Sequence, residues 1–568
     1  MKNRWIILNS PEVCIEEFAR ETNTSPLVAR LLLNRGINDP SDAKRFLEPR
    51  LADLTSPFLL RGMENAVTRI MAAINRGERI TIWGDYDVDG VTSTTLLLSF
   101  FRDLGCPVTY FIPDRFVHGY GLSSEPLQHI ADQGTTLVIA VDCGINGVRQ
   151  VAEMAKRNVD VIVVDHHEPK SELPPAAAVV NPLQDQCEFP YKKLAAVGLT
   201  FYLLIALRAK MRSAESFRFG KREPDLRSYL DLVAIGTVAD VVPLTGINRI
   251  ITYHGLRQIG MNGRAGVSAL CQVSGIGSKV SAGNVGFQLG PRINAAGRLS
   301  SATKGVEMLM AGQFEDALAI AQEVDVENRR RRSIEKAMVQ QADAQVIEMG
   351  GNLRRSFVLA GEGWHSGVTG IVASKIVEKY YRPTLVIAVD GVTGKGSGRS
   401  VAGFHLVQGL DQCGRYLQNY GGHAHAVGVT IASSDVPRFR DALENVAAGM
   451  LSEDDLIPKI LIDAEVSLES VTRSMVDDIE HLAPFGNGNP RPAFLVRNVR
   501  VTEIRVVGHE HVRMTVEKDG SIRRCIAFRM AERCPEVGSM LDVVFHAEEN
   551  EWRGISSIQM RIRDFRAA

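Results

Sequence analysis

Apolar and polar positions alternate with two different periods between residues 60 and 270. Short apolar runs that end in polar residues predict buried strands at 80–83, 107–113, 135–142 and 159–165. Helical spacing is seen at 64–77 and from Val91 onward, and a further apolar run ends at Asp240. Strands separated by helices are typical of a parallel sheet, so this region is predicted to be an α/β domain.

Residues 280–350 are predicted to be mostly helical, and one long helical pattern begins at Phe314. The charged centre of this pattern, 327–336, is too polar for a core and predicts a solvated helix that bridges two domains. Arg329–Arg332 within it have two interpretations, either a solvated helix face or a contact with a phosphate backbone. We favour the solvated face.

The C-terminal part of the chain predicts two further domains. Residues 354–450 contain strands at 355–364 and 384–391 and a helix at 367–380, which indicates a second α/β unit. From residue 458 onward, short strands at regular spacing predict a small barrel, for which an OB-fold is the natural candidate.

Residues 1–55 predict a small helical cap, with helices that begin at Ser25-Pro26 and at Pro40-Ser41. We expect it to pack on the following domain. The expected division of the chain is 1–55, 56–275, 276–350, 351–452 and 453–568.

Composition is that of an ordinary globular protein, with 45% hydrophobic and 23% charged residues. The net charge of −1 excludes a global basic field, so any nucleic-acid binding must rest on local basic patches. The eight cysteines form no CxxC pair, which favours reduced thiols and a cytoplasmic protein. We expect no signal peptide and no membrane span, because no apolar stretch is suitable.

Acidic residues and histidines follow the ends of four successive elements, where an α/β active site is built. The predicted metal-site residues are Asp85, Asp87, Asp89, Asp142, His166 and Asp240. Five carboxylates and one imidazole are enough for two divalent ions, Mg²⁺ or Mn²⁺, that share a carboxylate. Two such ions stabilise the attacking and leaving oxygens of a phosphoryl displacement. Asp142 comes from the middle strand and is the expected bridging ligand.

The segment DYDVDG by itself also resembles the start of an EF-hand calcium loop. That interpretation fails locally, because position twelve is Leu96 and the residues after Gly90 are apolar. We expect Asp85, Asp87 and Asp89 to lie in a turn that Gly90 ends. His167 is expected to point away from His166 and to donate to a phosphate oxygen, although a merely satisfied neighbour is equally compatible. Asp89, Asp142 and His167 are the predicted catalytic residues.

Candidate phosphate and strand contacts lie elsewhere along the chain: Arg115, Tyr120, Arg292, Asn294, Arg298, Ser397, Arg399 and His423. Arg292, Asn294 and Arg298 stand among small residues in GPRINAAGRL, which is either a ligand approach or a helix-packing turn. Ser397 and Arg399 stand in GSGRS, whose glycine-flanked N–H groups suggest an anion nest.

These motifs together resemble the DHH/DHHA1 phosphoesterase superfamily. DYDVDG, VDCG, Asp165-His166-His167 and the VAD segment ending at Asp240 are similar to its catalytic motifs, and GGHAHAVG is similar to the DHHA1 glycine-rich motif. Within the superfamily, GPRINAAGR, EGWHSGVTGIVASK, the long helix and the C-terminal barrel resemble the bacterial RecJ exonucleases. The resemblance covers nearly the whole chain and is weakest over the first 50 residues.

The resemblance implies a single-strand-specific DNA exonuclease that runs 5′ to 3′, needs Mg²⁺ or Mn²⁺ and releases 5′-mononucleotides in recombination and repair. It implies that the metal-site residues are those named above and that His167 touches the scissile phosphate. Arg115, Arg292, Ser397 and Arg399 would hold the 5′ end or the backbone, and His423 would line the same groove. Implied partners are a single-stranded-DNA-binding protein and a recombination helicase, and the implied state is a monomer.

Two rival functions remain. A phosphodiesterase or pyrophosphatase acting on short oligonucleotides or cyclic dinucleotides uses the same metal site but commonly lacks a barrel. A non-catalytic strand-binding scaffold predicts missing carboxylates, and none is missing.

Overall fold

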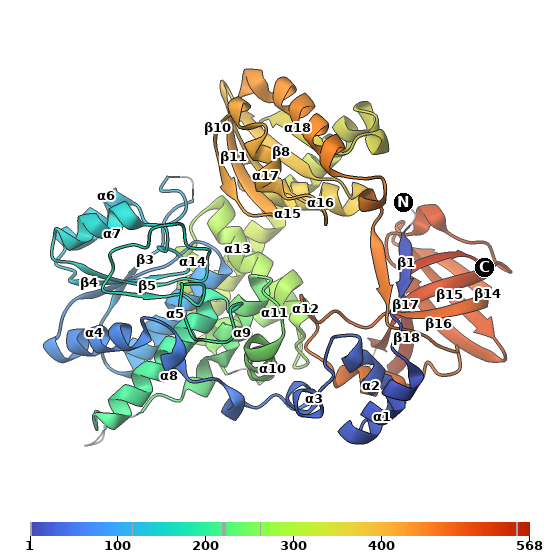
Figure 1. The fold of residues 1–568 in the computed structure, drawn as a ribbon, viewed down its shortest axis with the longest axis horizontal. Helices are drawn as coiled ribbons and strands as arrows, with labels where there is room; N and C mark the ends of the chain where they lie inside the picture. The colour runs from blue at the N-terminus through green and yellow to red at the C-terminus, as the bar shows by residue number, and fades with distance from the viewer. Residues whose placement is uncertain (1–2, 116, 218–222, 262, 553–554) are drawn as a thin grey trace. The chain divides into compact units, whose positions relative to one another are not determined.

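A computed structural model describes residues 3–115, 117–217, 223–261, 263–552 and 555–568 (Figure 1). The chain forms two compact units. One contains the residues up to Leu8 together with Arg329–Glu465, and the other contains Asn9–Asn328 together with Val466–Ala568. The long helix α15 (Phe314–Glu348) belongs to both.

The first sheet of the larger unit is parallel, with the strand order β3-β2-β4-β5-β6. Its strands are β2 (Ile80–Trp83), β3 (Thr109–Phe111), β4 (Leu137–Val141), β5 (Asp160–Val164) and β6 (Ala178–Val180). The four strands predicted from apolar runs are β2 to β5, so the α/β prediction is confirmed.

Helices cover both faces of this sheet, because successive strand residues point to opposite sides. On one face, Val138, Val161 and Val163 pack with α6 (Ser124–Asp132) and α7 (Val148–Ala155). On the other face, Ile82, Ile139 and Ile162 share a core with α4 (Met63–Arg76), α5 (Val88–Asp103), α8 (Ala196–Ser213) and α9 (Leu230–Ala239). α5 is almost wholly buried, and α8 is buried up to Leu207 except for the partly buried Ile205, which explains their lack of a polar face.

A helical layer follows the sheet domain. Its elements are α10 (Gly246–Gly260), α11 (Ala265–Ser274), α12 (Ala282–Asn284), the π-helix η4 (Val285–Leu289), α13 (Gly290–Leu299) and α14 (Thr303–Met310). The predicted solvation of the centre of α15 is wrong at two positions, since Asn328 and Arg331 are buried and Arg331 pairs with Glu335 at 3.6 Å.

The smaller unit holds the second α/β sheet, with the order β10-β11-β9-β8-β7. Its strands are β7 (Phe357–Glu362), β8 (Thr384–Asp390), β9 (Thr393–Arg399), β10 (Leu417–Gly422) and β11 (Ala426–Ala432). One face packs against α16 (Thr369–Tyr380) and the end of α15, and the other packs against α17 (Leu406–Asp411) and α18 (Val436–Met450).

The predicted anion nest in GSGRS is wrong, because these residues form the central strand β9. Its backbone pairs with β8 on one side and β11 on the other. The glycines instead allow close packing: a Cβ on Gly394 or Gly396 would lie 2.7 or 2.8 Å from the Ile387 side chain. Ser397 and Arg399 alternate with these glycines and therefore point to the opposite face of the sheet.

The C-terminal barrel is closed by five strands in the order β14-β15-β16-β18-β17, with β17 paired back to β14. These strands are β14 (Phe494–Val507), β15 (His511–Lys518), β16 (Ser521–Ala527), β17 (Met540–Trp552) and β18 (Ile555–Ala567). β16 and β18 are parallel, and the other neighbouring pairs are antiparallel. The predicted barrel is confirmed.

The N-terminal segment is partly helical, with α1 (Glu12–Thr22), α2 (Pro26–Leu33) and α3 (Pro40–Leu47). Ser25 caps α2 by accepting the Val28 N–H at 3.2 Å. The expectation of helices alone is incomplete, because β1 (Arg4–Ile7) pairs in parallel with β12 (Lys459–Ile462).

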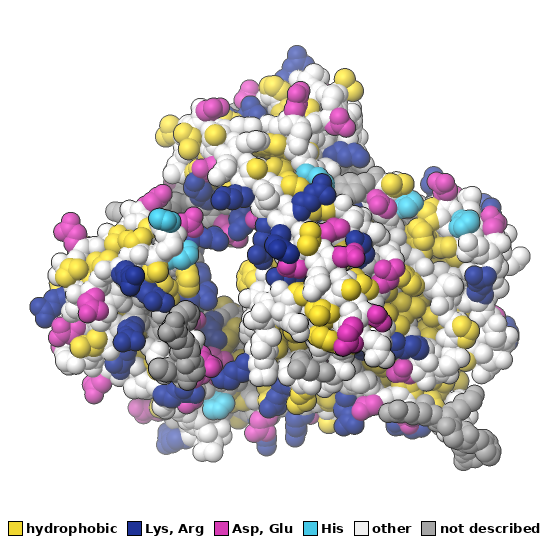
Figure 2. Space-filling view, turned by 180° about the vertical axis from the view of Figure 1, so that it is seen from behind, with side chains coloured by type: hydrophobic (Ala, Val, Ile, Leu, Met, Phe, Trp, Pro, Cys, Tyr) yellow, Lys and Arg dark blue, Asp and Glu magenta, His cyan; other side chains and the backbone are white. Residues whose placement is uncertain are grey.

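Basic and acidic side chains are interspersed over the face shown in Figure 2, as the near-zero net charge predicts. None of the helices in the described part of the chain combines the length and apolarity that a membrane span needs.

Candidate metal centre

The acidic loop after β2 is closed by Asp87, which caps α5. Its carboxylate accepts the N–H groups of Asp89 at 2.9 Å and of Gly90 at 3.2 Å. The helix therefore begins at Val88, and the prediction of a turn up to Gly90 is wrong. Gly90 is needed for close approach: a Cβ there would lie 2.5 Å from the Asp85 backbone. The loop thus folds back onto the first turn of its own helix.

Asp89 lies inside α5 and is fully buried, yet its carboxylate is well satisfied. It accepts the Ala196 N–H at 2.7 Å and the Val197 N–H at 2.8 Å, at the start of α8. Unpaired N–H groups and the dipole of a helix N-terminus both favour negative charge. α8 therefore fixes the direction in which Asp89 points.

Asp142 follows β4 and adopts φ +62°, in the left-handed region that non-glycine residues seldom occupy. Its N–H donates to the Val164 carbonyl at 3.0 Å, which ties it to the end of β5. Strain of this kind costs about 1–3 kcal/mol and is retained where the surroundings impose it. Here the imposed conformation turns a buried carboxylate toward His166.

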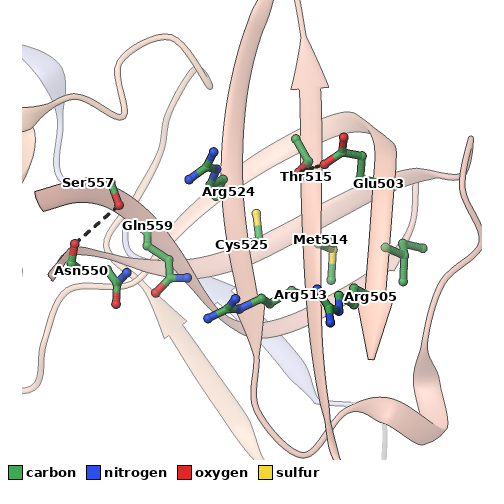
Figure 3. A pocket seen from close by; sticks show the side chains of 11 residues that line it. Glu503, Arg505, Arg513, Met514, Thr515, Arg524, Cys525, Asn550, Ser557 and Gln559 are labelled. Carbon is green, nitrogen blue, oxygen red and sulfur yellow. Dashed lines mark hydrogen bonds between the residues drawn. The ribbon is translucent and has the colours of Figure 1, made fainter. Parts of the chain in front are cut away.

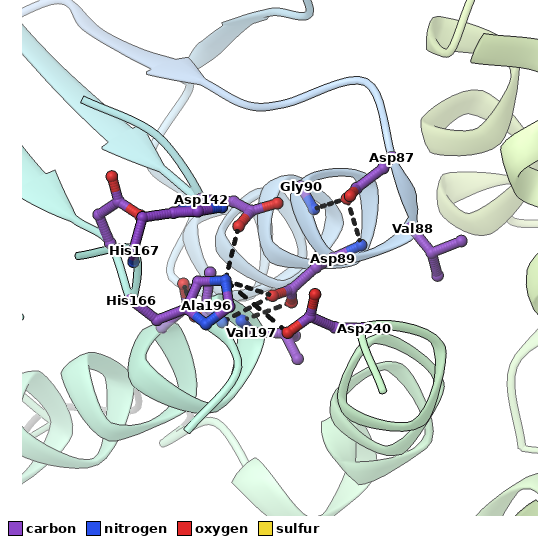
Figure 4. A network of polar contacts seen from close by, with 12 residues as sticks. Asp87, Val88, Asp89, Gly90, Asp142, His166, His167, Ala196, Val197 and Asp240 are labelled. Carbon is purple, nitrogen blue, oxygen red and sulfur yellow. Dashed lines mark hydrogen bonds and ion pairs between the residues drawn. The ribbon is translucent and has the colours of Figure 1, made fainter. Parts of the chain in front are cut away.

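His166 is the centre of the cluster drawn in Figure 4. Its Nε2 atom lies 3.4 Å from Asp142 Oδ1, 3.7 Å from Asp240 Oδ2 and 3.9 Å from Asp89 Oδ2. Asp240 is the C-terminal capping residue of α9. Side chains from α5, from the end of α9 and from the end of β4 thus converge on one imidazole.

Three groups of side chains have ligand atoms within 4.8 Å of one another: Asp85 with Asp87 and Asp142, Asp89 with His166 and Asp240, and Asp142 with His166 and His167. All six predicted metal-site residues belong to these groups. Asp142 and His166 each occur in two of them, and of the two only Asp142 has a carboxylate that two ions could share.

Burial and mutual repulsion dominate the electrostatics. Burial, followed by the charges of neighbouring aspartates, raises the pKa values of Asp85, Asp142 and Asp240 well above their ordinary range. The same causes raise the pKa of Asp89 to about 7. Burial, and then the charge of His167, lower the pKa of His166 to about 4, so this imidazole is neutral at physiological pH.

The unpartnered buried atoms of this cluster and its ligand types fit a divalent cation. Asp85 Oδ1, His166 Nε2 and Asp240 Oδ2 are buried and have no hydrogen-bond partner within the described chain. Buried polar atoms are almost always paired, and crowded carboxylates need a compensating charge. Oxygen ligands with one imidazole suit Mg²⁺ or Mn²⁺.

We expected His167 to point away from His166, as in an extended segment, and this expectation is wrong. The centroids of the two rings are only 4.5 Å apart. The cause is Asp165, a fully buried residue that belongs to the Asp165-His166-His167 motif but was not among the predicted site residues. Its carboxylate accepts the His167 N–H at 3.1 Å, His167 Nδ1 at 2.7 Å and the Ile145 N–H at 3.0 Å. Burial alone lowers the pKa of His167, but the hydrogen bond and charge of Asp165 raise it overall.

Several predicted strand-binding residues lie beside this cluster. The Tyr120 hydroxyl is 3.2 Å from His167 Nε2 and 3.3 Å from the Asp142 carbonyl. The Arg115 guanidinium lies over the Tyr86 ring, 5.1 Å from its centroid. α13 meets the same loop, since a Cβ on Gly297 would lie 2.4 Å from the Tyr86 carbonyl oxygen. Burial raises the pKa of Tyr86 to about 12, and the positive charge of Arg298, the residue after Gly297, opposes this rise.

Arg292, also on α13, is held by hydrogen bonds within the protein. It is buried, and it donates to Asp325 at 2.9 Å and to the Gln288 carbonyl at 2.8 Å. Asn294 is half-buried on the same helix. The role of both in strand binding stays a prediction.

Ser397, Arg399 and His423 belong to the smaller unit. Ser397 Oγ lies 3.1 Å from Thr369 Oγ1, at the start of α16. Arg399 is paired in register with Ala426, the residue whose carbonyl accepts the His423 N–H at 2.9 Å. The three side chains thus come from one end of the sheet, near a helix N-terminus.

Comparisons with known proteins agree with this architecture. Models of the DHH family N-terminal domain, the DHHA1 domain and the RecJ OB domain match residues 79–237, 353–449 and 462–564. The single-stranded-DNA-specific exonuclease RecJ of Bacillus subtilis is 38% identical, over 99% of this chain and 71% of its own length. The exonuclease of the same name from Escherichia coli is 35% identical, over 94% of this chain and 95% of its own.

Solved structures lead to the same family. RecJ of Thermus thermophilus in complex with Mn²⁺ superposes with a TM-score of 0.85 at 30% identity, covering 100% of this chain and 80% of that one. Its complex with Mg²⁺ gives a TM-score of 0.79 at 28% identity, covering 100% of this chain and 78% of that one. The resemblance seen in the sequence motifs is confirmed: the chain belongs to the RecJ family of single-stranded-DNA-specific exonucleases.

Proposed function

We propose that this protein is a single-stranded-DNA-specific exonuclease that acts from the 5′ end and releases 5′-mononucleotides. The observation that carries the proposal is the complete cluster of five carboxylates and His166 at the end of a parallel sheet. A scaffold has no need for that many buried, mutually repelling carboxylates. A small-substrate phosphodiesterase has no need for a C-terminal OB barrel.

The ligands of the proposed ions are Asp85, Asp87, Asp89, Asp142, His166 and Asp240, with Asp142 shared. When bound, two divalent ions, Mg²⁺ or Mn²⁺, supply the positive charge that stabilises the attacking and leaving oxygens. The reaction forms a P–O bond from water and breaks the bond between phosphorus and the 3′ oxygen of the terminal nucleotide. The shortened strand keeps a 5′-phosphate, so each cut recreates the end that the next cut requires.

His167 is the proposed phosphate contact. Its Nδ1 is engaged by Asp165 at 2.7 Å, so Nε2 is the atom left to face a phosphate oxygen. The Tyr120 hydroxyl lies near both ring nitrogens, 3.0 Å from Nδ1 and 3.2 Å from Nε2. The raised pKa of His167 increases the fraction that is protonated near neutral pH, and a protonated imidazole donates from both nitrogens. His167 thereby holds a proton at Nε2 next to the anionic phosphate.

Strand contacts are assigned by charge and position. Arg115, Tyr120 and Arg298 lie around the metal cluster and are proposed to hold the nucleotides being cut, with Arg292 and Asn294 on the same helix as Arg298. Ser397, Arg399 and His423 are proposed to bind the 5′-phosphate, which a helix N-terminus also favours.

The barrel offers a second contact, a cavity of about 600 Å³ shown in Figure 3. Arg505 on β14 and Arg513 on β15 are directly opposite in register, and Arg524 on β16 is opposite Thr515. Like charges directly opposite in a sheet are destabilising. In the described chain, none of the three arginines has an ion pair, and a phosphate backbone would supply the missing negative charge.

Partner proteins and cellular setting complete the proposal. We assign the protein to recombination and repair, acting as a monomer with a single-stranded-DNA-binding protein and a recombination helicase. All eight cysteines are free, which supports a cytoplasmic setting. The proposed domains are the N-terminal cap at 1–55, the catalytic domain at 56–275, the helical connector at 276–350, the DHHA1 domain at 351–452 and the OB domain at 453–568.

The test is cleavage of single-stranded DNA labelled at either end, with Mg²⁺, Mn²⁺ or chelator. We expect mononucleotides from the 5′ end, dependence on metal and loss of cleavage in Asp142→Ala. Asp160→Asn, at a surface pair with Arg69, is the matched control. Hydrolysis of dinucleotides without cleavage of long strands would favour the small-substrate function, and strand binding without cleavage would favour the scaffold.

A further inference from the structure

The loop Phe485–Asn489 connects α19 (Arg473–Glu480) to the OB barrel and contacts the turn that follows Asp240. Asn487 Nδ2 donates to the Val241 carbonyl at 2.7 Å. In return, the Leu244 N–H donates to the Asn487 carbonyl at 2.7 Å. Two short hydrogen bonds thus join this loop to the residues directly after a proposed metal ligand.

The glycines on either side of Asn487 make this approach possible. A Cβ on Gly486 would lie 2.6 Å from Leu244 Cδ1, and a Cβ on Gly488 would lie 2.9 Å from Pro243 Cβ. Gly488 also adopts φ +72°, a conformation that suits glycine. The sequence Gly-Asn-Gly therefore fits this surface where larger residues would be excluded.

The loop is held firmly on its own side. Gly486 and Asn489 exchange backbone hydrogen bonds at 2.9 and 3.1 Å. The fully buried Asn489 side chain donates to the carbonyls of Leu482 at 2.8 Å and Pro484 at 2.9 Å, and accepts from Arg35 Nε at 2.9 Å. Asn487 is therefore presented by a loop whose position is fixed independently of the metal cluster.

The turn that accepts the Asn487 hydrogen bond has a strained backbone. Val241 adopts φ +61°, which is a genuine outlier for a β-branched residue. Its side chain is 65% exposed, so packing does little to hold it. The Asn487 amide binds the peptide carbonyl of this residue, one position beyond Asp240, whose Oδ2 lies 3.7 Å from His166 Nε2.

We propose that Asn487 is a positioning residue for the metal centre, which holds Val241 in its strained conformation and so directs the Asp240 carboxylate toward the position of a divalent cation. The segment that leads into the OB barrel thereby completes the metal site of the sheet domain. The inference rests on the proposed role of Asp240 as a ligand, and the experiment tests the two separately.

The experiment measures Mn²⁺ binding by calorimetry, without DNA, for wild type and Asn487→Asp. This substitution keeps the side-chain shape but replaces the amide donor with an acceptor. Loss of an outer-shell partner costs about 10- to 100-fold in metal affinity, and we expect a loss of that size. The KM for DNA at saturating Mn²⁺ should stay within about twofold of wild type, because no proposed strand contact changes. Asn158→Asp, the same exchange at an exposed turn, should bind Mn²⁺ like wild type.

Val241→Asn supplies a specific rescue. Asparagine enters the left-handed region far more readily than valine, so the turn then needs less support from Asn487. In the Asn487→Asp background we expect Val241→Asn to recover at least about tenfold in Mn²⁺ affinity, most of the predicted loss. Wild-type affinity in Asn487→Asp, or no recovery in the double variant, would overturn the proposal.

Two further variants separate the remaining outcomes. Asn487→Ala is measured in parallel, and failure of both Asn487 variants to fold would assign the loop a purely structural role and overturn the proposal. Asp240→Asn tests the ligand itself. If Asp240→Asn binds Mn²⁺ like wild type, the ligand assignment fails; if only Asp240→Asn weakens binding, the positioning role of Asn487 fails.

Discussion

His166 Nε2 lies 3.4 Å from the carboxylate of the buried Asp142, and this nitrogen is itself buried; the two residues follow the ends of neighbouring parallel strands. The pKa of one group is lowered to about 4 while that of the other is raised well above its ordinary range, in both cases chiefly by burial. A neutral imidazole beside carboxylates that resist ionisation is a site that gains stability from a cation. The stability of the protein should therefore depend jointly on pH and metal.

The first prediction concerns stability without metal. A carboxylate whose folded pKa is raised contributes stability that is full below its unfolded pKa and is lost as pH rises through the folded pKa. Asp89 titrates at about 7, and Asp85, Asp142 and Asp240 are shifted in the same direction. His166, with its lowered pKa, acts in the opposite direction only below about pH 6.5.

The melting temperature of metal-free protein should therefore fall as pH rises above about 6.5. The increase in melting temperature caused by Mn²⁺ should grow as pH rises further above this value, because the ligands are then ionised. Differential scanning calorimetry with and without Mn²⁺ measures both effects. Asp240→Asn should flatten the pH dependence of the metal-free protein, and an equally steep dependence in that variant would contradict this account.

The second prediction concerns Asp165. Asp165→Asn removes the charge that orients His167 and raises its pKa, so cleavage should fall by about 10- to 100-fold, as for other outer-shell partners. The alkaline limb of the pH–rate profile should move to lower pH, because His167 then loses its proton more easily. Mn²⁺ affinity should change less than in Asp142→Ala. The control is Asp160→Asn, and an unshifted profile in Asp165→Asn would refute the orienting role.

The third prediction concerns the arginines on the barrel. Replacing Arg513 or Arg524 with Ala should weaken strand binding, and each replacement should reduce the slope of log affinity against log salt by about 0.7, the value for one phosphate contact on a single strand. Cleavage of a dinucleotide, which is too short to reach a second contact, should be unchanged. Arg149→Ala on α7 is the control, since that side chain is 77% exposed and pairs only with Glu153 at 3.6 Å among the contacts described. Equal salt slopes in all variants would exclude the barrel cavity as a strand contact.

The fourth prediction concerns Gly90. Gly90→Ala places a Cβ within 2.5 Å of the Asp85 backbone, so either the loop or α5 must move. Overpacking of this kind costs about 1–3 kcal/mol, and Mn²⁺ binding should be lost with it. Gly312→Ala, where no atom lies within 4 Å of the new Cβ, is the control. Urea unfolding and Mn²⁺ titration of both variants provide the measurement.

Much of the fold was predictable because apolar runs and helical spacing are local signals. β2 to β5 were found from such runs, and the short strands from residue 458 onward predicted the barrel. β1 was missed, because four residues that pair with distant β12 carry no local strand signal.

Site residues could be predicted where polar side chains directly follow the end of a strand. They were harder to predict where contacts between distant segments determine the role of a side chain. Asp142 and His166 converge as expected, because parallel strands end at the same edge, and Asp240 joins them from the C-terminal end of α9. Asp165 was not predicted as a site residue, because the sequence does not show which of the two following histidines its carboxylate orients. Asn487 was beyond sequence reasoning, since 246 positions separate it from the Val241 carbonyl that it binds.

The closed OB barrel has a consequence for how a strand can be held. β14 and β17 pair and complete the ring, and β15, which carries Arg513, pairs with β14 on one side and with β16 on the other. DNA therefore cannot add to β15 by backbone pairing. A strand bound there must be held by side chains, and guanidinium–phosphate contacts of equal kind can be exchanged one at a time. Advancing by one nucleotide then replaces each contact with an identical one, so the grip can be kept while the substrate shortens.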